Sequence, residues 1–157
     1  MSEWTHFDPS GRARMVDVGE KPETRREATA RAIVRMRPET LAMIREGRLA
    51  KGDVLAVAQV AGIMGAKKTP DLIPMCHNIP IGSVNAKFTL GDDYVEARCR
   101  VAATYRTGVE MEALTGVSVA LLTVWDMVKY LEKDERGQYP STRITDIRVI
   151  EKRKEEA

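Results

Sequence analysis

Residues 67–80, KKTPDLIPMCHNIP, combine chemically active side chains with a restrained backbone. Each proline in this segment fixes its own φ and biases the preceding residue towards an extended conformation. The loop therefore presents Met75, Cys76 and His77 from a stiff backbone, as a binding or catalytic group requires. A rigid connector whose histidine bonds only to backbone has the same features, so both interpretations stay open.

An aspartate and a lysine on a long predicted helix are the second candidate group. A helix over residues 109–133 places Asp126 and Lys129 three positions apart, where their side chains can touch. On an exposed surface such a pair contributes only about 0.3–0.5 kcal/mol. Val119 and Leu122 share its side of the helix and indicate a covered surface. A covered pair is the better catalytic candidate, because burial and a charge partner shift pKa values.

Lys51 stands just before Asp53, the expected N-cap of a helix over residues 54–68. A helix N-terminus with a nearby lysine suits a phosphate, and the positive end of the helix dipole lowers the lysine pKa. Lys67 would serve the same polyanion. Both residues are equally compatible with ordinary surface lysines.

Met111 and Glu112 lie in the first turn of the long helix. Acidic residues favour the positive end of a helix, which is a sufficient structural explanation for Glu112. The functional alternative is that both residues line a pocket and bind a heterocycle. Glu112 and Asp126 lie ~21 Å apart along one helix at 1.5 Å per residue. If both serve one small-molecule site, they come from different subunits.

The composition excludes several classes of protein. A formal net charge of +2 over 157 residues is too small for a strong nucleic-acid footprint. Cys76 and Cys99 form no disulfide framework, and the alternation around Cys99 places it in the core. Cys76 and His77 lack the two further ligands of a structural zinc site, so no metal is expected. Phosphate-binding glycine motifs, a signal segment and a membrane span are not recognisable, so a cytoplasmic protein is expected.

The elements that position these residues follow from hydrophobic periodicity. Three- and four-residue spacings predict helices over residues 23–37, 38–46, 54–68 and 109–133. Alternation predicts strands over residues 15–18, 84–90, 95–101 and 143–150. We expect one domain, residues 1–157, with an N-terminal arm (1–13) and a charged, frayed tail (151–157). The order predicts an α+β fold: a ferredoxin-like, mainly antiparallel sheet with helices packed on one face.

Several motifs resemble the cyclic pyranopterin monophosphate synthases of molybdenum cofactor biosynthesis. They are MVDV (15–18), KGDV (51–54), AKKTPDLIPMCH (66–77), TGVEMEALTGVSVALLTVWDMVK (107–129) and DIRVIEK (146–152). The resemblance spans residues 4–152. It implies a lyase that converts (8S)-3′,8-cyclo-7,8-dihydroguanosine 5′-triphosphate into cyclic pyranopterin monophosphate and diphosphate. It also implies a cytosolic homohexamer, a trimer of dimers, with active sites between subunits.

The resemblance also implies roles for individual residues. Lys51, Lys129 and Asp126 match catalytic residues, and His77, with Met75 and Cys76, matches a substrate-binding loop. Three further groups are a pocket pair (Met111 and Glu112), a phosphate-contacting arginine (Arg26) and a lysine that closes over the substrate (Lys152). The glycine-rich lysine loop that commonly ends the family is replaced here by IEKRKEEA.

The ligand expected from this resemblance is the small cyclised nucleotide, with Mg²⁺ as an option that would accompany its triphosphate and with no resident cofactor. The other expected partners are copies of the same chain, not nucleic acid or a membrane. Two alternatives belong to other classes: a non-catalytic oligomeric module that binds a phosphorylated ligand, and a nucleic-acid binder. The second predicts steeply salt-dependent retention on DNA or RNA.

Overall fold

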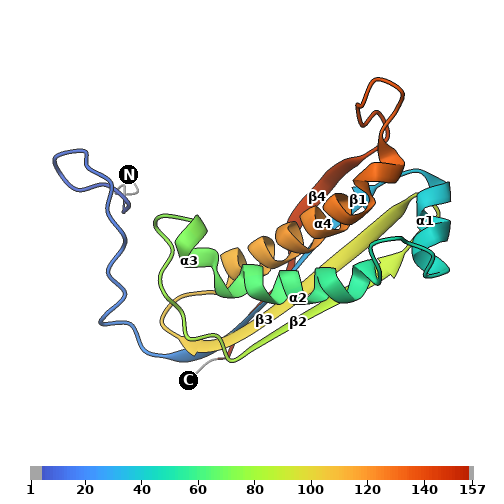
Figure 1. Cartoon of the computed structure of the whole chain (residues 1–157). Helices are drawn as coiled ribbons and strands as arrows, with labels where there is room; N and C mark the ends of the chain where they lie inside the picture. Colours follow the sequence, from blue (N-terminus) through green and yellow to red (C-terminus); the bar gives the residue numbers. More distant parts are fainter. Residues whose placement is uncertain (1–4, 156–157) are drawn as a thin grey trace.

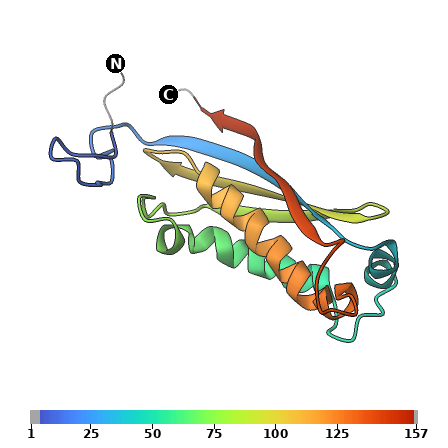
Figure 2. The ribbon, with the colours of Figure 1, turned by 90° about the horizontal axis from the view of Figure 1, so that it is seen from above.

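Four antiparallel strands form one sheet in the order β2-β3-β1-β4 in the computed structural model, which describes residues 5–155. The strands are β1 (Thr24–Arg35), β2 (Ser83–Leu90), β3 (Tyr94–Tyr105) and β4 (Arg143–Lys154), and the helices are α1 (Pro38–Arg45), α2 (Val54–Lys67), α3 (Thr69–Leu72) and α4 (Glu110–Glu132). The long helices α2 and α4 lie side by side on one face of the sheet (Figures 1 and 2). This strand order and helix placement confirm the predicted ferredoxin-like α+β fold.

Strand β1 occupies the segment for which the sequence predicts a helix over residues 23–37, so that prediction is wrong. Ala28, Ala30, Ala32 and Val34 point to the helices and are at most 1% exposed, and Thr29, Arg31 and Ile33 alternate with them. Alanine favours a helix when only local preference acts. Here β1 pairs along its whole length with β3 on one side and with β4 on the other, so tertiary pairing overrides the local preference.

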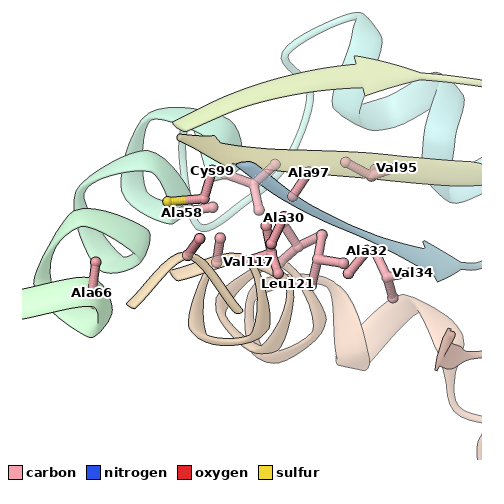
Figure 3. Packing of buried hydrophobic residues seen from close by; sticks show 14 of the residues in the cluster. Ala30, Ala32, Val34, Ala58, Ala66, Val95, Ala97, Cys99, Val117 and Leu121 are labelled. Atoms are coloured by element: carbon pink, nitrogen blue, oxygen red, sulfur yellow. The ribbon is translucent and has the colours of Figure 1, made fainter. Parts of the chain in front are cut away.

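Small residues allow the sheet and the two long helices to approach closely (Figure 3). A Cβ atom at Gly65 would lie 2.8 Å from the Val119 side chain of α4, and one at Gly116 would lie 2.6 Å from Cys99 Sγ on β3. The apolar stripe of α4, which includes Val117 and Leu121, packs against the alanines of β1. Cys99 is buried, as predicted, and burial raises its pKa to about 12.

The last residue of α4, Glu132, places a carboxyl group in the protein interior. Glu132 is 2% exposed and accepts hydrogen bonds from Thr40 Oγ1 (2.5 Å), Thr142 Oγ1 (2.7 Å) and the backbone N–H of Arg37 (3.1 Å). Burying a charge is tolerated only where such partners replace water. Glu132 therefore ties the end of α4 to the start of α1 and to the residue before β4.

The two ends of the chain differ from prediction. No strand occurs at residues 15–18, and this segment is part of an extended arm, residues 5–23, that projects from the body (Figure 1). Strand β4 continues to Lys154 instead of fraying after residue 150, because residues 151–154 pair with β1. Residues 1–4 of the predicted arm and residues 156–157 of the predicted tail lie outside the described residues.

Helix α4 is the one helix between residues 5 and 155 that is long and apolar enough to cross a membrane, judged by length and composition alone. In the structure 56% of its most apolar stretch is buried. It packs against α2 and the sheet, as the core helix of a globular domain does.

Candidate active site

Lys51, Asp126 and Lys129 gather near the C-terminal end of α4, and we call them the lysine cluster. Lys129 Nζ lies 2.7 Å from Asp126 Oδ1, which confirms the predicted contact. Lys51 Nζ donates to the backbone carbonyl of Asp126 at 3.2 Å and lies 6.0 Å from the centre of the Tyr130 ring. The loop that carries Lys51 is held against α4, because the N–H of Ala50 donates to the Tyr130 hydroxyl at 3.2 Å.

The charges of the lysine cluster stabilise one another. The hydrogen bond from Lys129 holds the pKa of Asp126 below its usual range, and the same bond raises the pKa of Lys129. Both groups are therefore charged at neutral pH. The prediction that this side of α4 is covered is wrong within one chain, since the Asp126 side chain is 63% exposed and Leu122 is also exposed.

A second group surrounds a cavity of about 290 Å³ that we call the histidine pocket. It lies between the loop after α3, the start of α4 and the arm. The structure places all five residues predicted for the loop and the pocket pair around it: Met75, Cys76, His77, Met111 and Glu112.

The two titratable groups of the pocket with raised pKa values are a carboxyl and a thiol. Burial, followed by the nearby charge of Glu110, raises the pKa of Glu112, which is 2% exposed. Burial also raises the pKa of Cys76, with the carboxylate of Glu112 adding to the effect. Cys76 is thus a thiol at neutral pH, and a thiol is a poor nucleophile. Glu112 is suited to a hydrogen bond with an N–H group of a ligand.

His77 already has one structural partner. Its Nε2 lies 2.6 Å from the carbonyl oxygen of Val16 in the arm. A carbonyl only accepts, so Nε2 carries the proton, and in the neutral ring Nδ1 is left as an acceptor. His77 therefore holds the arm against the pocket and keeps a single ring nitrogen for a ligand.

Three other predicted residues lie outside these two groups. Arg26 donates to the carbonyl oxygen of Tyr105 (3.1 Å), the last residue of β3, and to that of Arg106 (3.4 Å), the first residue of the connection into α4. Lys67 borders a separate groove beside Ile79 and Ile81.

Lys152 Nζ is 2.5 Å from Glu110 Oε1, at the edge of the histidine pocket. Burial of Glu110 opposes its charge, but the hydrogen bond from Lys152 outweighs burial and lowers the pKa of Glu110.

The lysine cluster and the histidine pocket are separate in one chain. Asp126 and Glu112 stand on the same helix, ~21 Å apart at 1.5 Å per residue. A small molecule that contacts the histidine pocket does not reach the lysine cluster of the same chain.

Sequence reasoning missed the contribution of the arm. His6, Val16, Val18 and Lys21 also line the histidine pocket. One signal was available, since the chain has two histidines and the MVDV motif lies within the arm. The contact itself joins segments some sixty positions apart, as in the bond between His77 and Val16, and no local pattern encodes it.

No three His, Cys, Asp or Glu side chains within residues 5–155 gather in a way that could hold a metal ion. The titratable side chains of the two candidate groups are amines, carboxyls, imidazoles and the Cys76 thiol. Such side chains perform general acid–base catalysis and stabilise developing charge.

The fold and the two groups define an α+β protein in which the long helix α4 carries titratable residues near both of its ends. The model of the MoaC family matches residues 15–155, and the chain belongs to this family. Membership confirms the resemblance found in the sequence and makes the chain a lyase of molybdenum cofactor biosynthesis.

Similar proteins occur in several archaea. A protein of Pyrococcus abyssi is 60% identical over 148 residues, which cover 94% of this chain and 92% of that protein. One from Thermococcus onnurineus is 58% identical over 156 residues, or 99% of each chain. One from Methanoregula boonei is 59% identical over 154 residues, covering 98% and 99%. All three bear the name "Probable cyclic pyranopterin monophosphate synthase".

Proposed function

We propose that the protein converts (8S)-3′,8-cyclo-7,8-dihydroguanosine 5′-triphosphate into cyclic pyranopterin monophosphate and diphosphate. The observation that carries this proposal is the pairing, on one helix of a MoaC-family chain, of a heterocycle-sized pocket with a distant amine–carboxylate cluster. The reaction opens a purine imidazole ring, closes a pterin ring and expels diphosphate. These steps need proton transfers and cations opposite developing phosphate charge.

The histidine pocket is assigned to the heterocycle. Glu112 is buried at the pocket, where its carboxyl oxygens can accept hydrogen bonds from the N–H edge of a guanine-derived ring. Met75 and Met111 supply polarisable apolar surface for the faces of that ring. Nδ1 of His77 is the remaining nitrogen that can accept a hydrogen bond from the ligand.

The lysine cluster is assigned to the chemical steps. Asp126 keeps Lys129 protonated, so Lys129 is the proton donor or the cation that faces developing phosphate charge. Lys51 supplies the second amine, within 3.2 Å of the Asp126 carbonyl. Asp126 orients both lysines, through its carboxylate and its backbone oxygen. Mg²⁺ would accompany the triphosphate as part of the substrate.

The active site is assigned to an interface between subunits, because one chain separates the two groups. Exposed apolar residues support a second copy on this side: Val57, Val60 and Met64 on α2 and Leu122 on α4 are each about half exposed or more. Burying such residues drives association. We propose a homohexamer built as a trimer of dimers, working in the cytoplasm. A sedimentation mass of six chains would support it, and a monomer would contradict it.

The decisive test is incubation of the pure protein with the cyclised nucleotide, followed by measurement of diphosphate and of the pterin product. Lys51→Ala and Lys129→Ala should each abolish product while the oligomer persists. Lys133→Ala is a matched control, because this exposed lysine lies just after α4 and outside both groups. Binding without turnover, under conditions in which another synthase is active, would instead support the non-catalytic binding module.

A further inference from the structure

Both histidines of the chain border one cavity. His77 comes from the loop after α3, and His6 comes from the arm some seventy positions earlier in the sequence, yet each lines the histidine pocket. Figure 1 shows the arm leaving the body at the start of β1 and running up the side of the molecule on which α3 lies. The pocket thus has a wall made by the arm, in addition to the loop and the start of α4.

The backbone of His6 belongs to an ordered turn. Its carbonyl accepts from the N–H of Arg14 at 2.9 Å. Asp8 Oδ1 accepts from the backbone N–H groups of Ser10 and Arg12, each at 2.9 Å, which closes the turn between them. An isolated bridge pairs Phe7 with Ala13. Local hydrogen bonds of this kind fix where a side chain is presented.

Two further contacts hold the arm to the body. His77 Nε2 donates to the carbonyl oxygen of Val16 at 2.6 Å, and Arg106 Nη1 donates to that of Gly19 at 2.6 Å. Val18, between these contacts, is 8% exposed. These contacts fix residues 16–19 of the arm against the body, and the turn presents His6 from this anchored segment.

Different chemical groups line the two sides of the pocket. The start of α4 contributes the carboxyl groups of Glu112 and of Glu110, which is paired with Lys152, whereas the arm contributes the imidazole of His6 and the amine of Lys21. A polyphosphate is repelled by carboxylates and attracted by N–H donors and cations. A ligand that places its heterocycle against Glu112 therefore directs its phosphates towards the arm.

We propose that His6 is a substrate-binding residue, whose imidazole contacts the phosphate side of the bound nucleotide while Glu112 contacts the heterocycle. This inference rests on the proposed function for the identity of the substrate. It adds a residue and an orientation: the arm of the chain forms the phosphate-facing wall of the pocket.

Steady-state kinetics with the cyclised nucleotide tests the inference. A hydrogen bond to a charged group is strong enough that His6→Ala should raise KM by about tenfold, with kcat within about threefold of wild type. His6→Gln keeps an N–H donor and should recover part of the loss. Arg12→Ala removes a cation from the same turn. Because Arg12 lines no part of the pocket, the KM of this variant should equal that of wild type. Equal KM values for His6→Ala and wild type would overturn the proposal.

Nuclear magnetic resonance gives a readout that needs no turnover. With two histidines per chain, the imidazole spectrum has two sets of signals, and His6→Ala identifies which set is His6. Addition of GTP, a stable purine triphosphate, should move the His6 signals saturably. If wild type makes no product, the proposed function fails, and this titration alone then decides the role of His6. His6 signals that stay unmoved at millimolar GTP would overturn the inference.

Discussion

Two inactive variants should restore activity to each other when they share an oligomer. Lys51→Ala damages the lysine cluster, and Glu112→Ala damages the histidine pocket. The groups lie ~21 Å apart on one chain, so the proposed active site takes one group from each of two neighbouring subunits. A mixed oligomer then contains some sites in which both groups are intact.

The activity expected of the mixed oligomers follows from the fraction of their sites in which both groups are intact. In an equal mixture with random exchange, half of the chains carry an intact lysine cluster and half carry an intact histidine pocket. The fraction of sites with both groups intact is their product, so mixed oligomers should show about one quarter of wild-type activity. A site built within one chain would recover nothing, because every chain carries one damaged group.

The assay is diphosphate release by oligomers that contain both variants, isolated through two different affinity tags. Lys51→Ala mixed with Asp126→Asn is the matched control. Both residues belong to the lysine cluster of one chain, with Lys51 Nζ 3.2 Å from the Asp126 carbonyl oxygen, so this mixture should stay inactive. No recovery in verified oligomers of Lys51→Ala and Glu112→Ala, or recovery in the control, would refute the shared site.

Three further predictions concern stability. Gly116→Ala places a Cβ atom 2.6 Å from Cys99 Sγ, so urea unfolding should show a loss of about 1–3 kcal/mol; an unchanged midpoint would contradict the close packing. Glu132→Ala leaves buried donors without their acceptor and should cost roughly 2–4 kcal/mol in the same measurement, whereas Glu135→Ala, at an exposed position after α4, should change little. Burial of Glu96 opposes its charge, but the hydrogen bonds from Arg31 and Arg98 outweigh burial and lower the pKa of Glu96 below 4.5. The ionised side chain therefore stabilises the folded protein above pH 4.5, and this stabilisation is lost as the pH falls through the pKa of the folded state. The difference in unfolding free energy between wild type and Glu96→Gln should therefore shrink below pH 4.5, and a constant difference would refute this assignment.

The long helices and the hairpin were predictable because their patterns are local. The stripe of α4 and the alternation along β2 and β3 repeat often enough to indicate one structure each. Asp53 was expected to cap α2, and its Oδ1 accepts from the N–H of Ala56 at 3.1 Å. The contact between Asp126 and Lys129 followed from helix geometry alone.

Strand β1 was missed because alanine obscures its alternation. Ala28, Ala30 and Ala32 mark one face every second residue, but alanine is a strong helix former and is weakly apolar. The predicted fold class already indicated a strand at this position, because a ferredoxin-like sheet needs a strand before its first covering helix. Agreement between levels of structure is therefore a better guide here than local preference.

The sequence indicated which residues belong to the candidate site but not how they are arranged in space. Sequence patterns identified Lys51, Asp126 and Lys129 and the residues of the proline-rich loop. They did not show that His77 binds the arm at Val16 or that Arg26 binds the connection into α4. Those bonds join segments far apart in the sequence, and only the folded chain brings them together.

Helix α4 also fixes the relative orientation of the two groups that one chain contributes to the proposed sites. A helix turns by about 100° and rises 1.5 Å for each residue, so the angle between the directions of Glu112 and Asp126 is fixed by their separation in sequence. One residue inserted between them would rotate Asp126 relative to Glu112 by about 100°, although every side chain of both groups would remain. In the proposed site, the length of this segment therefore matters as much as the residues at its ends.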